Sequence, residues 1–147
     1  RGCAIFYTNE YNKYSYPLDK LYFRNCIISG YSDDEIFASK SKVFEDAAFN
    51  YGFFNSLLDT PEITDDDKVS GCAWDKTDNA VSRNKNFYKF DSNTLIYDFR
   101  PVEKSLAVGL GDAVVTRQFY PRDMNGVERL SDGRSDAGCY EFVPEKK

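Results

Sequence analysis

A stretch of ten residues returns in altered form thirty residues later, and this repeat constrains the fold more than any other feature of the sequence. Residues 21–30 read LYFRNCIISG, and residues 51–60 read YGFFNSLLDT. In register, Phe23 matches Phe53 and Asn25 matches Asn55, and each Asn precedes a small residue and two aliphatic residues. A period of roughly 20 to 50 residues is typical of architectures in which neighbouring units stack to bury a shared apolar core.

Each unit has the composition of a strand, with aromatic and aliphatic residues over about six positions and polar residues or glycine on either side. We predict that the two units pair as parallel strands of one sheet, one coil apart, in a parallel β-solenoid. Asn25 then lies under Asn55 in a ladder of like side chains, where an amide can satisfy the main chain of a tight corner. The alternative is that two strands of an ordinary β-sandwich resemble each other.

The bulk properties exclude several classes of function. The 147 residues carry a net charge of −5 and no basic stripe, so we expect no nucleic-acid partner. No run of about 18 apolar residues is present, so we expect no transmembrane segment. The sequence has no histidine, which excludes histidine-based acid–base catalysis and Ser–His or Cys–His nucleophiles.

The four cysteines, Cys3, Cys26, Cys72 and Cys139, are widely spaced and form no Cys-x-x-Cys motif. An even number of cysteines permits disulfides in an exported protein. Cys26, however, matches Ser56 in the repeat, where a small buried thiol fits without any bond. We favour free buried thiols over disulfides.

We predict a single domain over residues 1–147. Residues 1–100 form the coils, and two polar stretches, 31–50 and 61–86, leave them as extruded loops. The first of these loops holds at most one short strand or helical turn. Residues 101–147 form a C-terminal capping segment, because the last coil of a solenoid otherwise exposes apolar side chains and unpaired strand edges.

The C-terminal third resembles a known family. Residues 120–129 read YPRDMNGVER and residues 133–142 read GRSDAGCYEF. They are similar to the "D-x-x-G-x-x-R … G-x-x-D-x-G-A-Y-E" ending of exported right-handed parallel β-helix proteins, the pectate-lyase-like and choice-of-anchor proteins of Bacteroidetes lipoproteins. Cys139 stands where that ending has Ala, and Ala137 where it has Ile or Met. The resemblance implies an all-β fold, a right-handed parallel β-helix of about three coils with a C-terminal cap.

The residues that match this ending are expected to build the cap: Asp123, Gly126, Arg129, Asp136, Gly138, Tyr140 and Glu141. Asp123 and Gly126 have the composition of a turn. We expect Arg129 to pair with Asp136 across the glycine-rich turn between them, and Gly138 to allow a close approach of the main chain. The ring of Tyr140 is expected to cover the open end of the stack.

Two acidic runs, residues 33–35 and 65–67, can supply oxygen ligands to calcium, which polysaccharide lyases of this fold use. Neither run has the spacing of an EF-hand loop, and solvated loop carboxylates are the simpler interpretation. We therefore predict no cofactor and no metal site, with calcium as the alternative. Arg24, Arg100 and Arg117 belong to no catalytic motif, so we assign no catalytic residue.

Exposed aromatic side chains can stack on sugar rings, and the candidates in the sequence are Tyr11, Tyr14, Tyr16, Tyr31 and Trp74. The competing interpretation is that these rings pack inside and between the coils.

These observations favour a non-catalytic β-helix module that contacts a polysaccharide or another surface polymer. The alternative is the C-terminal fragment of a polysaccharide lyase or glycoside hydrolase whose catalytic coils lie upstream; a purely structural cap and spacer is a third interpretation. From the resemblance we expect an exported protein at the cell surface, attached to the outer membrane or periplasmic. The uncharged strand expected over Cys3–Thr8 predicts a homo-oligomer formed through this N-terminal edge.

Overall fold

The structure, a computed structural model, describes residues 2–65, 67–75 and 85–144. The described chain is mostly β-strand, with the short helix α2 (Ala113–Phe119) near its C-terminal end. The strands are β1 (Ile5–Thr8), β2 (Glu10–Tyr11), β3 (Tyr14–Ser15), β4 (Leu18–Arg24), β5 (Ile27–Ile28), β6 (Ile36–Ser39), β7 (Phe49–Phe54), β8 (Leu57–Leu58), β9 (Val69–Ser70), β10 (Ala73–Trp74), β11 (Phe87–Asp91) and β12 (Ile96–Pro101). Within the described ranges, no helix has the length and apolar character needed to cross a membrane.

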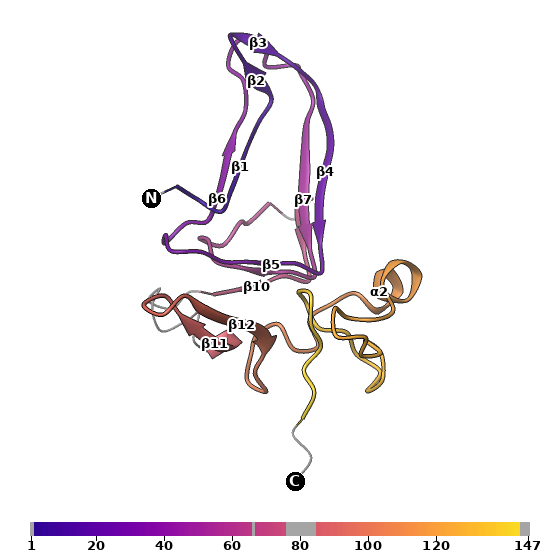
Figure 1. Cartoon of the computed structure of the whole chain (residues 1–147). Coiled ribbons are helices and arrows are strands. Elements are labelled where there is room, and N and C mark those ends of the chain that lie inside the picture. Colours follow the sequence, from indigo (N-terminus) through magenta and orange to yellow (C-terminus); the bar gives the residue numbers. More distant parts are fainter. Residues whose placement is uncertain (1, 66, 76–84, 145–147) are drawn as a thin grey trace.

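Three parallel sheets form the N-terminal part of the molecule, and Figure 1 shows them as the three sides of a triangular outline. Their strand orders are β1–β6, β4–β7–β9 and β5–β8–β10. The predicted parallel pairing of the repeat is confirmed, because Phe23 lies opposite Phe53 and Ile27 lies opposite Leu57.

Each repeat unit bends in its middle, so the prediction of one strand in one sheet is wrong. Asn25 and Asn55 have φ angles of 53° and 50°, in the left-handed region that Asn tolerates better than most residues. The chain therefore turns a corner at each Asn. The first half of each unit joins the β4–β7–β9 sheet, and the second half joins the β5–β8–β10 sheet.

A third copy of the unit, residues 69–74, forms β9 and β10. Val69 pairs with Phe53 and Ala73 pairs with Leu57, so Gly71 occupies the corner position, with a φ angle of 64°. The predicted extruded loop over 61–86 is therefore wrong for these residues, which continue the parallel sheets. Part of that loop, residues 76–84, lies outside the described residues.

The predicted loop over 31–50 also contributes to the parallel sheets. It contains β6, which pairs in parallel with β1, and it ends in the first residues of β7. Glu35 is buried in this stretch, and hydrogen bonds from the main-chain N–H groups of Ala4 (2.7 Å) and Ser32 to its carboxylate compensate for the burial. Residues 42–46 remain exposed, as expected for a loop.

The interior of the triangle is an apolar cluster in which side chains from successive strands stack. Its buried members are Tyr7, Ile28, Ile36, Phe53 and Leu58. The rings of Phe23 and Phe53 lie nearly parallel, with centroids 5.1 Å apart. Burial of one such side chain contributes about 1.5–3 kcal/mol, so this cluster stabilises the parallel sheets.

Residues 87–101 do not continue the coils, contrary to the prediction. β11 and β12 pair antiparallel, with Phe90 opposite Tyr97, and form a separate hairpin. The apolar composition of the two runs predicted strands correctly but carried no information on their direction.

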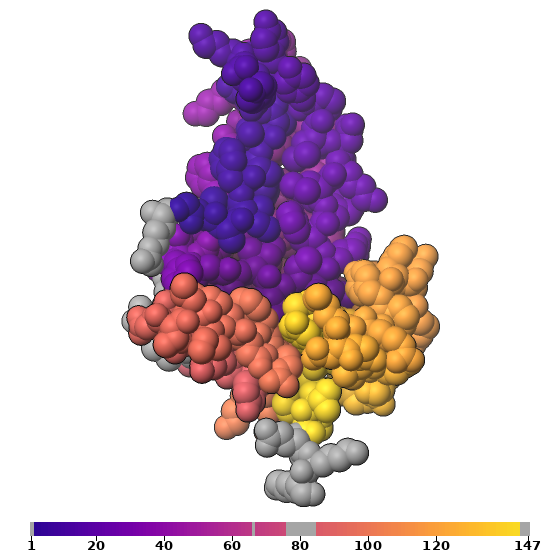
Figure 2. Space-filling view, in the orientation of Figure 1, coloured from indigo at the N-terminus to yellow at the C-terminus, as the bar shows by residue number. Residues whose placement is uncertain are grey.

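The C-terminal segment covers the outer face of the β5–β8–β10 sheet, below the triangle in Figures 1 and 2. Ala107 and Ala137 are fully buried there against Leu57, with Ile27 packed beside them. The main-chain N–H of Gly138 donates to the carbonyl oxygen of Asn25 (2.8 Å). The C-terminal segment therefore covers the side of the stack and not, as expected, its open end. The two adjacent aliphatic residues of each unit face opposite sides of the sheet, so one of them points away from the interior and needs this cover.

Candidate functional site

The two corner asparagines connect the strand region to the C-terminal segment. The Asn25 side chain accepts from the N–H of Asp112 (2.8 Å) and donates to the hydroxyl of Thr116 (3.0 Å). The Asn55 side chain donates to the carbonyl oxygen of Leu110 (3.2 Å). The predicted ladder residues thus share a register position, and their amides fix the segment that leads into α2.

A buried ion pair organises the residues expected to form the cap. Arg129 and Glu141 are 5% and 8% exposed, and their side chains are 2.8 Å apart. The Arg129 guanidinium also donates to the carbonyl oxygens of Asp136 (3.3 Å) and Gly138 (2.8 Å). The predicted ion pair with Asp136 is wrong, because the Asp136 carboxylate instead accepts from the N–H groups of Gly109 and Phe142.

The carboxyl groups of Asp123 and Glu141 complete this network. The Asp123 carboxylate accepts from the N–H groups of Asn125, Val127 and Glu141, and Gly126 has a φ angle of 80°, which confirms the predicted turn. Burial raises the pKa of the Glu141 carboxyl to about 7, and the charge of Asp136 adds to the rise, although Arg129 opposes it.

Gly138 allows the close approach that the sequence predicted. Its φ angle is 97°, and a Cβ atom at this position would lie 2.8 Å from Cδ1 of Ile27. The segment that follows Gly138 therefore runs directly beside β5, the edge strand of its sheet.

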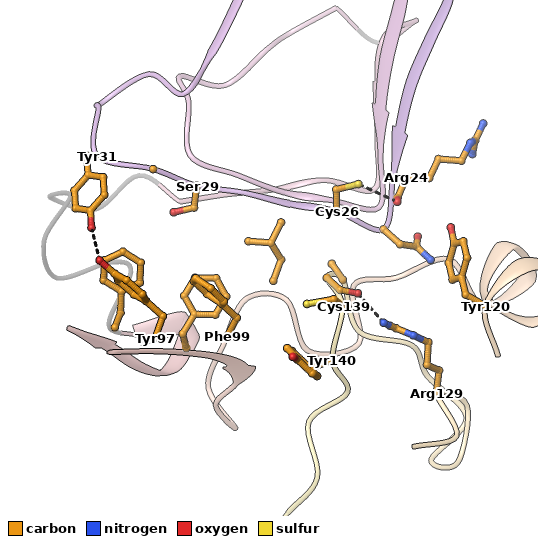
Figure 3. A pocket seen from close by; sticks show the side chains of 17 residues that line it. Arg24, Cys26, Ser29, Tyr31, Tyr97, Phe99, Tyr120, Arg129, Cys139 and Tyr140 are labelled. Carbon is orange, nitrogen blue, oxygen red and sulfur yellow. Dashed lines mark hydrogen bonds between the residues drawn. The ribbon is translucent and has the colours of Figure 1, made fainter. Parts of the chain in front are cut away.

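A groove of about 710 Å³ lies between the edge of β5, the β11–β12 hairpin and this C-terminal segment (Figure 3). Three stretches far apart in the sequence line it: residues 24–31 at and around β5, four aromatic residues of the hairpin, and residues of the C-terminal segment. The lining residues are Arg24, Asn25, Cys26, Ile27, Ser29, Gly30, Tyr31, Phe87, Phe90, Tyr97, Phe99, Tyr120, Arg129, Ala137, Gly138, Cys139 and Tyr140.

Aromatic rings dominate the groove, and several of them present hydroxyl groups. The hydroxyls of Tyr31 and Tyr97 lie 3.3 Å apart and join the loop after β5 to the hairpin. The rings of Tyr97 and Phe99 are parallel, with centroids 5.8 Å apart. The hydrogen bond with Tyr31 raises the pKa of Tyr97, and burial raises the pKa of Tyr120.

Among the residues that the structure describes, the lining of the groove includes neither Asp nor Glu. Arg24 lines it, but its side chain points away from the groove in Figure 3 and lies over the ring of Phe54, at 4.2 Å. Arg129 is engaged with Glu141. This arrangement provides apolar faces and hydroxyl or amide hydrogen-bonding groups, and the described lining offers no pair of carboxylates of the kind used in glycoside hydrolysis.

The four thiols are free, as favoured, but the expectation that they are buried is wrong: Cys139 is exposed, and Cys3, Cys26 and Cys72 are only partly buried. Cys26 and Ser56 hold the same repeat position, and each donates to the carbonyl oxygen two residues earlier, at 3.2 Å from the sulfur and 2.8 Å from the hydroxyl. Burial raises the pKa of Cys26 and of Cys72. Both thiols are therefore poor nucleophiles.

The acidic runs have other partners. Asp34 accepts from the hydroxyl of Thr60 and from the N–H of Ile36, and Asp65 pairs with Lys68, whereas Asp66 lies outside the described residues. No group of three or more His, Cys, Asp or Glu side chains suited to a metal ion occurs in the described part of the chain.

The aromatic residues singled out in the sequence lie in three places. Tyr11, Tyr14 and Tyr16 are exposed at the β2–β3 hairpin, which lies at the opposite end of the triangle from β5 in Figure 1. Trp74 packs against the interior cluster, and Tyr31 lines the groove. Tyr140, expected to cover the open end of the stack, lines the groove instead. Sequence reasoning missed Tyr97, Phe99 and Tyr120; the alternation of Tyr97 and Phe99, which places both rings on one face of a strand, was the available signal.

No family model, no curated protein and no solved structure matches this chain.

Proposed function

We propose that this protein is a non-catalytic module of an exported or surface protein and that it binds a glycan in the aromatic groove. In this proposal the three parallel sheets are the three faces of a right-handed parallel β-helix, and each turn contributes a strand to each face it passes through. The repeated corner at Asn25, Asn55 and Gly71, the parallel register and the resemblance of the C-terminal ending support this assignment.

The observation that carries the proposal is the composition of the groove. Sugar rings present an apolar C–H face and a rim of hydroxyl groups, and aromatic rings with nearby hydrogen-bonding groups complement both. Tyr31, Tyr97 and Tyr120 are partly exposed and supply both a ring and a hydroxyl. Tyrosine is the side chain that combines an aromatic ring with a hydroxyl group.

The groove is lined both by the strand region, at β5, and by the later part of the chain, the β11–β12 hairpin and the C-terminal segment. Binding in the groove therefore depends on the association of these two parts. Tyr31 follows β5, Tyr97 belongs to β12, and Tyr140 belongs to the C-terminal segment. A glycan bound here contacts all three, so the intact chain is the binding unit.

A glycan array followed by titration calorimetry on the responding oligosaccharides tests the proposal. Tyr97→Ala should weaken binding about threefold to tenfold, because one aromatic contact contributes about 0.5–1.5 kcal/mol. Tyr14→Ala removes an equally aromatic side chain at the distant hairpin and should leave the affinity unchanged. Absence of binding to every glycan, or equal loss in both variants, would contradict the assignment.

Activity assays separate this proposal from its enzymatic alternative. Incubation of the protein with pectin, alginate or glycosaminoglycans, with and without calcium, should release no more unsaturated or reducing ends than a heat-treated control. Release above the control that is abolished by substitution of an arginine or aspartate would identify a polysaccharide lyase or hydrolase instead.

A further inference from the structure

β4 (Leu18–Arg24) is a free edge strand with an unusual outer face. It ends the β4–β7–β9 sheet, so one side of its main chain has no strand partner within the described chain. Its exposed side chains are Asp19, Lys20, Tyr22 and Arg24, and after a register irregularity between Leu18 and Leu21 the last three place a cation, an aromatic ring and a cation at every second position. An edge of this kind can form main-chain hydrogen bonds with an added strand.

The side chains of this face form an ordered array. The Lys20 ammonium lies 5.1 Å from the centre of the Tyr22 ring, and the Arg24 guanidinium lies 4.2 Å from the centre of the Phe54 ring. The Tyr22 and Phe54 rings meet edge to face at 5.3 Å. Gly52 makes room for Phe54, because a Cβ at position 52 would lie 2.7 Å from that ring. The cations are thus held in place by rings, with their N–H groups left for other partners.

Lys20 and Arg24 differ from those cations that pair with a carboxylate among the described residues. Arg100 pairs with Asp98, and Lys68 pairs with Asp65. Among the described residues, no carboxylate lies within ion-pair distance of Lys20 or Arg24. In a chain of net charge −5, the β4 edge, with Lys20 and Arg24 against Asp19, therefore keeps a net positive charge.

We propose that β4 binds an extended acidic peptide by strand addition, with carboxylates beside Lys20 and Arg24 and an aromatic residue beside Tyr22. Side chains on one face of a strand recur about every 6.6–6.8 Å, so a peptide of the pattern acid-x-aromatic-x-acid matches the row on β4. Cross-strand pairs of opposite charge and of aromatic rings stabilise such an edge. This proposal does not depend on the glycan groove.

The charges also argue against a second copy of this chain as the occupant of the β4 edge. In the antiparallel pairing that sets Tyr22 opposite Tyr22 of another copy, Lys20 lies opposite Arg24. Like charges directly opposite each other are destabilising, and Lys at an edge is a common means of preventing self-association. An acidic strand removes this repulsion and neutralises both cations.

Fluorescence anisotropy with a labelled synthetic peptide containing Glu-Thr-Tyr-Thr-Glu tests the proposal on the full chain at low salt. Lys20→Gln together with Arg24→Gln should raise Kd at least about threefold, because two exposed cross-strand ion pairs are lost. The matched control, Lys89→Gln with Lys104→Gln, removes the same charge elsewhere and should bind like the original protein. Tyr97→Ala, in the groove, should also leave peptide binding unchanged.

Two modified peptides test the strand geometry. One carries N-methyl groups on the two threonines between the glutamates, and the other carries them on the tyrosine and the glutamates. Alternate N–H groups of a strand face opposite sides, so only one of the two peptides should lose binding. Equal binding of both, equal effects of the two double variants, tighter binding of a peptide with Lys in place of Glu, or no binding of the parent peptide would overturn the proposal.

Discussion

The strand region, residues 5–74, and the C-terminal region, residues 87–142, are stabilised by different kinds of contact. In the strand region, like residues from successive turns stack into an apolar interior, as Phe23 does on Phe53. In the C-terminal region, the buried set is largely polar and centres on Arg129 and Glu141. In the strand region the same corner and strand pairing occur three times, whereas each contact of the C-terminal region occurs once.

This difference explains how mutations should act in the two regions. A stacked apolar side chain contributes through its burial, so the effect of a substitution follows the exposure of that position. A polar network contributes through complete pairing, so the loss of one partner leaves another group unsatisfied.

The largest effect is expected in the interior of the strand region. Phe53→Ala should lower the free energy of unfolding by about 3–5 kcal/mol, because it empties the centre of the stack. Phe53 is fully buried, whereas Phe37, a ring on the outer face, is 54% exposed, so Phe37→Ala should have a much smaller effect. Urea unfolding followed by circular dichroism measures both. Similar effects of the two substitutions would contradict the stacked interior.

The polar network should make stability depend on pH. The pKa of Glu141 is raised from 4.5 to about 7, so the folded state binds this proton more tightly than the unfolded state does. Its stabilising contribution is complete below pH 4.5 and is lost as pH rises through 7. The loss should be about 2–3 kcal/mol.

Urea unfolding at pH 4.5, 6 and 8 tests this prediction in the original protein and in Glu141→Gln. The variant cannot ionise at this position, so its stability should vary less over the same range. Parallel pH profiles of the two proteins would show that Glu141 does not titrate there.

The contact between the two regions can be tested at glycine. Gly138→Ala should destabilise the protein by about 1–2 kcal/mol more than Gly133→Ala. Both glycines have a positive φ angle, but a Cβ at position 138 meets Ile27, whereas a Cβ at position 133 has open space around it. Thermal unfolding of the two variants gives the comparison. Equal losses would show that the C-terminal segment does not press on β5.

The smallest effect is expected where two turns of the repeat can exchange residues. Cys26→Ser should change the free energy of unfolding by less than about 1 kcal/mol, because Ser56 already makes the equivalent hydrogen bond in the next turn. Cys26→Val has similar size but no donor, and it should be less stable than the Ser variant. The opposite order would argue against a shared role for the two positions.

The sequence revealed the first two turns because Phe23, Asn25 and their counterparts share residue types at a constant spacing. It concealed the third turn, since a shorter connection precedes Val69 and Gly71 replaces Asn at the corner. Asn and Gly have different side chains but share a tolerance of positive φ, so a search for that property would have detected the relation.

The C-terminal region was less predictable for a physical reason. The sequence identified Arg129 as a paired residue but not its partner, because Asp136 and Glu141 are both carboxylates within reach and the chain path decides between them. The groove was not predicted at all. Its walls come from β5, the hairpin and the C-terminal segment, and their association is set by packing, not by any local pattern. The seven residues of α2 are too few to show a helical period.

Cross-linking of adjacent turns tests the central claim, the parallel register of the strand region, most directly. In a variant with the natural cysteines replaced by Ser, Arg24→Cys and Phe54→Cys place two thiols at paired positions on the outer face. Neighbouring strands are about 4.8 Å apart, within the span of a disulfide, so mild oxidation should link them quantitatively. The pair Arg24→Cys and Asn50→Cys, offset along β7, should stay reduced. Efficient linkage of the offset pair, with none at Phe54, would contradict the register and the stacked turns built on it.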